Sequence, residues 1–183
     1  MKNRWNAFNI YLLAALGLLA ICGCASEDSK HKKVFSTLRV HFEGRRDVMG
    51  KSEEVMIGRD HPVKLIVEKV PFLNEGFVKQ AKVIDVLGGF ELQLQFDRDG
   101  SMLLEQYTTA NPGRHLAIFC EFMMPPEEKL NGGRWLAAPR ISAKITDGIL
   151  RFTPDASREE VDQIVLGLNN IAKKLETGQE PKW

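Results

Sequence analysis

Cysteine is scarce in this sequence, and neither sign of charge prevails. Two of the three cysteines lie within the first 24 residues, so Cys120 is the only one in the rest of the chain and has no partner there for a disulfide. Its apolar neighbours predict a buried structural thiol. Lys and Arg number 25 and Asp and Glu 24, a formal net charge of +1. That balance gives no support to nucleic-acid binding, which usually needs a clear basic excess or patch.

The motifs of the common enzyme classes are also missing. The chain contains no His-Glu-x-x-His, no Gly-x-Ser-x-Gly, no phosphate-binding loop and no dinucleotide fingerprint. The segment 97–100 starts like a calcium loop, but that loop needs an acid or Asn where this chain has Ser101 and a Glu where it has Thr108. A turn leading into a helix cap is the better interpretation. We therefore predict no catalytic residues, no metal site, no cofactor and no enzymatic activity.

Long apolar runs are confined to the N-terminus. Lys2 and Arg4 precede the apolar segment 10–21, which is the layout of a secretory signal peptide and is shorter than a spanning helix. The run ends in Ile21-Cys22-Gly23-Cys24, which resembles the bacterial lipobox. That resemblance implies cleavage before Cys24 and attachment of lipid to its sulfur and new amino group. Several acyl chains hold a protein on a membrane more firmly than one.

This N-terminus predicts an address in the cell envelope. We expect a signal peptide over 1–23, then a flexible tether over 24–33 that holds a periplasm-facing lipoprotein close to a membrane. No Asp follows Cys24, so the retention signal for the inner membrane is missing and the outer membrane is preferred. An uncleaved signal anchor and a cleaved peptide without lipid are the alternatives.

The region 34–89 is predicted to be rich in strands. Leu38, Val40 and Phe42 alternate with polar residues, the period-2 pattern of a half-buried strand, and 55–57 and 63–68 predict two more. The segment 77–87 suits a strand, although its beginning could also start a helix. Gly88-Gly89 then suits a tight hairpin.

The region 90–175 has a clearer pattern, followed by a tail over 176–183. Strands are expected over 90–96 and 115–122, with a helix between them whose face is Leu103, Tyr107 and Ala110. Alternation over 141–146 and the Asp147-Gly148 pair predict a hairpin that returns over 149–152. A capping box at Ser157 and Glu160 opens the last helix, whose apolar stripe is Val161, Ile164, Val165, Leu168, Ile171, Ala172 and Leu175.

These elements predict an α+β fold, an antiparallel sheet with two helices packed on one face, preceded by extra N-terminal strands. The pattern does not decide whether the strands of 34–70 join the same sheet.

From Phe90 to Leu175 the order of elements resembles the head subdomain of the first periplasmic domain of the SecD/SecF protein-export family. The residues that carry the resemblance are Gly113–Ile118, Ala138–Ile141, Ile145 with Gly148, Phe152-Thr153, and Glu159-Glu160 leading to Leu168. The segment from Val70-Pro71 to Val83 also resembles the entry into that head. The resemblance implies contact with emerging unfolded polypeptide, by analogy of fold. The family's six membrane helices, to which its proton-coupled work is assigned, have no counterpart after residue 25.

One loop carries the residue types that favour protein contacts. Phe122, Met123 and Met124 precede two prolines, and Arg134 and Trp135 follow the glycine pair 132–133. Met, Trp and Arg are adaptable or strong contact residues at interfaces, so these five side chains are the candidate partner-binding loop. The alternative is that Phe122 and Trp135 simply pack over one end of the sheet.

The sequence thus favours a membrane-anchored, non-enzymatic module that binds polypeptide or export and envelope proteins. An alternative is an envelope hydrolase or small-ligand-binding protein whose site is assembled from scattered residues such as His115, Asp97 and Glu121. A third possibility is a structural lipoprotein that helps to space the membrane.

Overall fold

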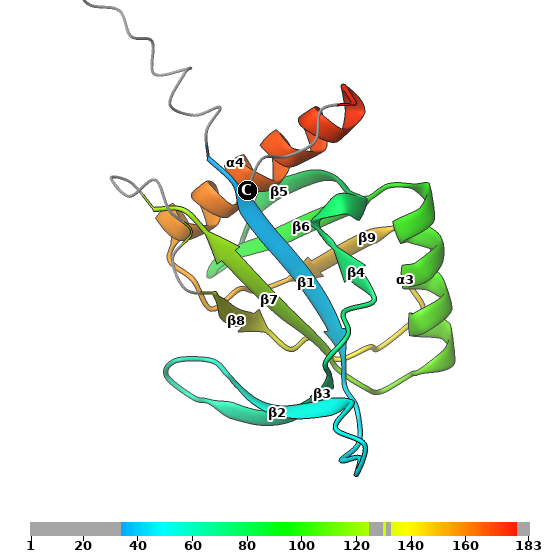
Figure 1. Cartoon of the computed structure of the whole chain (residues 1–183). Helices are drawn as coiled ribbons and strands as arrows, with labels where there is room; N and C mark the ends of the chain where they lie inside the picture. Colours follow the sequence, from blue (N-terminus) through cyan, green and yellow to red (C-terminus); the bar gives the residue numbers. More distant parts are fainter. Residues whose placement is uncertain (1–33, 125–129, 131–132, 179–183) are drawn as a thin grey trace, which may run out of the picture. The chain divides into compact units, whose positions relative to one another are not determined.

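The computed structural model describes residues 34–124, 130 and 133–178 (Figure 1). The predicted signal peptide and tether, including Cys24, lie outside the described residues. The strands are β1 (Ser36–Phe42), β2 (Ser52–Ile57), β3 (Val63–Glu68), β4 (Leu73–Asn74), β5 (Val78–Val86), β6 (Gly89–Phe96), β7 (Leu116–Phe122), β8 (Arg134–Ala137) and β9 (Ile149–Phe152). The helices are η1 (Glu75–Phe77), a short 3-10 turn, α3 (Arg98–Ala110) and α4 (Arg158–Glu176).

The strands form three antiparallel sheets rather than a single one. Four strands pair in the order β4-β1-β7-β8, three in the order β5-β6-β9, and β2 and β3 form a two-stranded ribbon. The predicted α+β class with two α-helices and N-terminal strands is confirmed. The question about residues 34–70 is also answered, because β1 pairs along its whole length with β7 of the second half.

The main core lies between the two larger sheets and the helices. Strict alternation places Leu38, Val40 and Phe42 of β1 on one side of the four-stranded sheet, and all three are buried, as predicted. Leu116, Ile118, Cys120 and Phe122 do the same on β7. The clean alternation of β6 likewise buries Leu92, Leu94 and Phe96.

Helix α4 closes this core. The predicted capping box is confirmed, since the Ser157 hydroxyl accepts a hydrogen bond from the Glu160 amide and the Glu160 carboxylate accepts one from the Ser157 amide. Most of the predicted stripe is buried, but Leu175 at the last turn is exposed. A Cβ on Gly167 would lie 2.2 Å from the Ser36 hydroxyl oxygen, so glycine is required for the close approach of α4 to β1.

An asparagine of α4 also closes one sheet edge. The Asn169 side-chain oxygen accepts the Ala81 amide at 2.8 Å, and its nitrogen donates to the Ala81 carbonyl at 3.0 Å. The outer edge of β5 is therefore paired with a side chain at this residue.

The buried face of helix α3 is shifted by one residue from the predicted face. Asp97 is the N-cap, and its carboxylate accepts the Gly100 amide at 2.8 Å, as the helix-cap interpretation expects. The buried side chains, however, are Leu104 and Thr108, while Ala110 is exposed. Thr108 is tolerated there because its hydroxyl donates to the Leu104 carbonyl and accepts the Ile145 amide.

The predicted hairpin over 141–152 is wrong. The segment 141–146 forms no strand, and β9 pairs with β6 instead. Pairing with β6 lets Leu150 and Phe152 enter the main core, which a local hairpin would not provide. Strand β8 was not predicted from the sequence, and it pairs with β7 through an irregular register.

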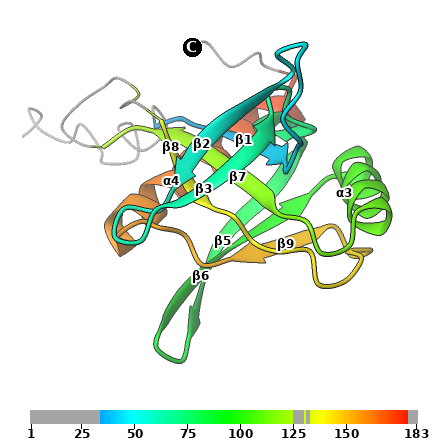
Figure 2. The same ribbon diagram turned by 90° about the horizontal axis from the view of Figure 1, so that it is seen from below.

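The β2–β3 ribbon covers part of the other side of the four-stranded sheet, which we call the outer face. Val55, Ile57, Leu65 and Val67 of the ribbon pack with Ala117 of β7, and Trp135 of β8 packs against them. Seen from below, the β1–β2 loop and the β5–β6 hairpin project from opposite sides of the described unit (Figure 2).

Candidate functional site

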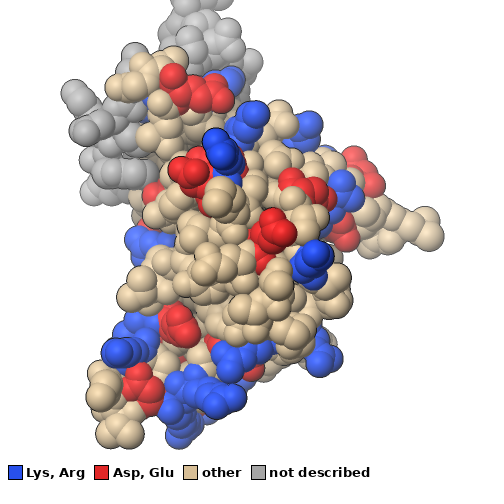
Figure 3. Space-filling view, turned by 90° about the vertical axis from the view of Figure 1, so that its right-hand side faces the viewer, with Lys and Arg blue, Asp and Glu red and all other residues tan. Residues whose placement is uncertain are grey.

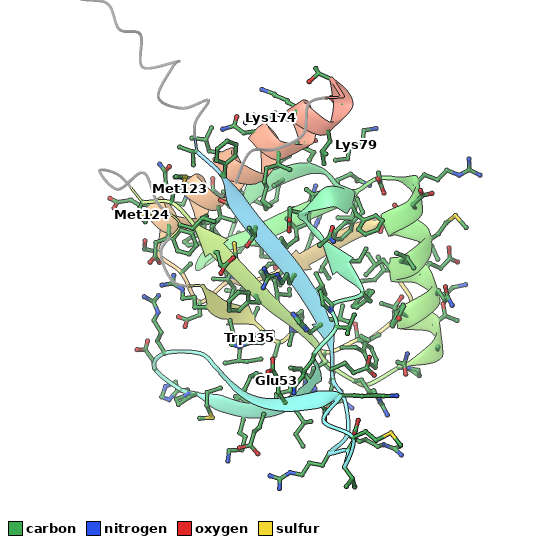
Figure 4. All side chains as sticks on the ribbon, viewed as in Figure 1. Glu53, Lys79, Met123, Met124, Trp135 and Lys174 are labelled. Carbon is green, nitrogen blue, oxygen red and sulfur yellow. The ribbon has the colours of Figure 1, made fainter. Side chains whose placement is uncertain are left out.

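The candidate partner-binding loop begins at the end of β7. Phe122 points into the main core and is buried, whereas Met123 and Met124 follow it and are half-buried. The Met123 sulfur accepts the Phe35 amide at 3.3 Å, and Met124 packs against the main core. The two methionines lie at the upper end of β7 in Figure 4. They join the loop to the sheet and leave part of each side chain in solvent.

Arg134 joins β8 to helix α4. Its guanidinium lies 2.5 Å from the Glu160 carboxylate and 5.3 Å from the centre of the Phe122 ring. The hydrogen bond from Arg134, supported by the Ser157 amide, holds the pKa of Glu160 below its usual value. Arg134 and Phe122 are thus brought together, but they stabilise the seam between sheet and helix.

Trp135 turns to the opposite side and belongs to the outer face (Figure 4). Its ring meets the ring of His41 edge-on at 5.1 Å between centroids and that of Phe119 at 5.2 Å. Edge-to-face packing is a favourable arrangement for aromatic rings. The alternative that Trp135 packs over the sheet describes what is seen, because the half-buried ring lies on β1 and β7. Part of the ring stays exposed, and its contact with a partner stays a prediction.

Polar side chains continue the outer face beyond these rings. Arg39 lies 5.9 Å over the Phe119 ring and 3.8 Å from the Glu121 carboxylate, which also accepts the Thr37 hydroxyl at 3.0 Å. Arg39 remains exposed. We call Arg39, Phe119, Glu121 and Trp135 the aromatic–arginine patch.

Buried His41 lies between this patch and the ribbon. Because a carbonyl only accepts, the His41 Nδ1 donates to the Glu68 carbonyl at 2.8 Å. Burial lowers the pKa of His41, against the raising effects of that hydrogen bond and of Glu53 on the ribbon. The neutral form of the His41 imidazole is therefore favoured while the β2–β3 ribbon packs on the sheet.

Sequence reasoning did not find Arg39, His41 or Phe119 as members of a site. A signal was present in the alternation, since all three lie at the outward positions of strands whose inward positions are mostly apolar. A phenylalanine at such a position is unusual for a solvent-facing side of a sheet. What the sequence could not show is that β8 brings Trp135 beside it.

The scattered residues of the alternative enzyme site lie in separate surroundings. His115 precedes β7 and Glu121 is next to its last residue, about 20 Å apart along an extended strand. The His115 ring and amide bind Glu43, and they hold the pKa of Glu43 below its usual value although burial alone would raise it. Asp97 caps α3. The structure brings none of these three side chains into contact through any hydrogen bond among the described residues.

In the part of the chain that the structure describes, the remaining titratable side chains form no cluster that could hold a metal ion. Cys120 is fully buried in the main core, and burial raises the pKa of its thiol far above the usual range. Within the described ranges, no group of three or more His, Cys, Asp and Glu is placed to hold a metal ion. None of the described helices is long and apolar enough to cross a membrane.

The fold places the described unit among small α+β domains built from antiparallel sheets. Within that class, the model of one family, described as SecDF, P1 head subdomain, matches residues 52–172, more than half of the chain. The chain belongs to this family. The match starts at β2, well before the Phe90 at which the resemblance in the sequence was clearest. No curated protein matches the sequence.

Solved structures agree with the family. A structure of a membrane component SecDF that enhances protein export aligns with a TM-score of 0.52 and 20% identity, over 82% of this chain and 71% of that chain. A structure of SecDF in its super-membrane-facing form aligns with a TM-score of 0.51 and 19% identity, over 79% of this chain and 21% of that chain. At these identities the likeness is one of fold.

Proposed function

We propose that the protein is a non-enzymatic, polypeptide-binding accessory of protein export, held by lipid on Cys24 at a membrane and facing the periplasm. Membership of the SecDF head family is the observation that carries this proposal. The solved SecDF that resembles this chain is described as a membrane component that enhances protein export. The domain boundaries expected from the sequence, with a tether over 24–33, belong to the same proposal.

The aromatic–arginine patch is the surface proposed to contact polypeptide. It offers two half-buried rings, an exposed guanidinium and a carboxylate within one face. Aromatic and Arg side chains dominate the energies of protein contacts, while mixed charges let one surface accept varied sequences. Met123 and Met124 at the end of β7 are half-buried and offer further adaptable contact groups beside the loop.

Site-specific photocrosslinking in intact cells tests the contact. A photoreactive amino acid in place of Trp135 is expected to crosslink exported polypeptides or components of the export machinery. The matched control replaces Met102, which is also apolar and exposed but lies on α3. Equal yields from both positions, or products free of exported proteins and export components, would reject the patch as a polypeptide-binding site.

The lipid anchor has its own test. Cells grown with a fatty-acid probe are expected to label the native chain and leave Cys24→Ser unlabelled. Separation of the two membranes then places the labelled protein, for which the outer membrane is proposed. A Cys24→Ser chain that still takes up the probe would reject this lipidation site without affecting the crosslinking result.

A further inference from the structure

The β1–β2 loop presents two apolar side chains to solvent. Val48 and Met49 have exposed fractions of 107% and 83%, although both residue types are usually buried. The loop is an ordered turn, because the Asp47 carboxylate accepts the amides of Met49 and Lys51. Gly50 has φ of +71°, which completes the reversal. The apolar tip is thus held in place by the Asp47 side chain within the same turn.

Basic side chains surround this tip. A cleft of about 820 Å³ behind it is lined by Arg45, Lys51, Lys69 and Arg114, against only two acids, Asp47 and Glu68. Asp47 is engaged with the loop amides, and Arg114 is held by the Glu43 carbonyl and the Phe42 ring. Figure 3 shows Lys and Arg side chains gathered at this lower end of the described unit.

We infer that this loop docks on an anionic lipid surface, with Val48 and Met49 entering the interface and the cations meeting lipid phosphates. Apolar side chains flanked by Lys and Arg are the composition of interfacial membrane-binding segments. A free phosphate would use the cations but would leave the apolar tip exposed to water. An acidic protein segment would likewise satisfy the charges without burying Val48 and Met49.

The β5–β6 hairpin provides an internal comparison. Leu87 at its tip is as exposed as Val48, at 106%. Its surroundings differ, because Asp85 beside it is paired with Arg158, and the cleft lined by Arg45, Lys51, Lys69 and Arg114 does not include the hairpin tip. The hairpin also projects to the opposite side (Figure 2). One exposed apolar tip therefore has the charges that complement an anionic bilayer, and the other does not.

The test uses the full chain reconstituted with vesicles of phosphatidylcholine, with and without phosphatidylglycerol. An environment-sensitive fluorescent amino acid replaces Val48 in one sample and Leu87 in another. We expect a blue shift at position 48 only with phosphatidylglycerol, and none at position 87. No shift at position 48, or equal shifts at both positions, would overturn the inference.

Charge variants extend the test. Replacing Arg45, Lys51 and Lys69 by Gln is expected to weaken the phosphatidylglycerol-dependent signal about a hundredfold in lipid concentration. The control replaces the exposed Lys79, Lys82 and Lys144, which removes the same net charge elsewhere and should leave the signal unchanged. A position-48 shift produced by an acidic polypeptide or inorganic phosphate without vesicles would also contradict a lipid surface. The inference does not depend on polypeptide binding, so crosslinking from Trp135 can succeed while this test fails.

Discussion

The two sides of the four-stranded sheet are stabilised very differently. On the inner side, a continuous core joins both larger sheets, α3 and α4. On the outer side, the β2–β3 ribbon contributes four buried side chains to a small cluster, in which they pack on Ala117, Trp135 and Ala138. Because hydrophobic stabilisation scales with the area removed from water, the ribbon should open at a lower free energy than the rest of the domain. The face proposed to contact polypeptide is next to the less stable element.

The largest effect is expected from the inner core. Leu168 of α4 is fully buried, so Leu168→Ala should lower the free energy of unfolding by about 3–4 kcal/mol. Leu175→Ala on the same helix removes an exposed side chain and should cost less than about 1 kcal/mol. Denaturant unfolding measures both. Similar losses from the two variants would contradict the placement of the α4 stripe.

The outer cluster should give a smaller and more local loss. Val67→Ala on β3 removes a fully buried side chain and should cost about 1–2 kcal/mol, with faster amide exchange confined to β2 and β3. Val63→Ala is the control, since Val63 lies on the same strand and is exposed. If exchange also rose in β6 or α4, the ribbon and the core would unfold as one unit.

The seam between β8 and α4 should contribute about 1–2 kcal/mol. Arg134→Gln removes the ion pair with Glu160 and the contact with the Phe122 ring, in a half-buried setting. Arg46→Gln removes the more exposed pair with Glu54 and should leave the free energy of unfolding nearly unchanged. Thermal or denaturant unfolding at neutral pH compares the two. Equal losses would show that the Arg134 pair behaves as an ordinary surface pair.

The smallest effect is a pH response of the ribbon. The pKa of His41 in the folded protein lies below its ordinary value of 6.5, so the unfolded state binds more protons as the pH falls through and below 6.5. His41 therefore supports the folded ribbon above that pH, and this support is lost on acidification. Amide exchange in β2 and β3, compared between neutral and mildly acidic pH, should show faster opening in acid. His41→Phe keeps a ring beside Trp135 and should remove the response, and an unchanged response in that variant would assign it to another group.

Local patterns predicted the inner side of the sheet well. Alternation in β1, β6 and β7 and the capping box of α4 are each decided by residues close together in the chain. The stripe of α3 was misplaced because Thr108 looks polar, and only the Ile145 amide and the Leu104 carbonyl make it a core residue. The short-range Asp147-Gly148 signal was misleading because β9 pairs with the distant strand β6, and Leu150 and Phe152 enter the main core there.

The candidate site was less predictable, because it depends on contacts distant in sequence. The sequence placed Phe122, Arg134 and Trp135 in one loop, but strand pairing turns Arg134 toward α4 and Trp135 toward His41. The adjacent strand positions alternate in direction, so two neighbours in the chain serve different faces. No local pattern could have shown that Arg39, Phe119 and Glu121 would meet Trp135.

The two hydrogen bonds between the Asn169 side chain and the Ala81 backbone have a consequence besides stability. They occupy the donor and acceptor of Ala81 that an added strand would otherwise use. A protein that handles unfolded chains meets many sequences ready to extend an open edge, and such growth leads to aggregation. On the proposed function, in which unfolded chains come near this domain, the amide side chain hinders the addition of a strand at Ala81 and leaves contact with polypeptide to side chains.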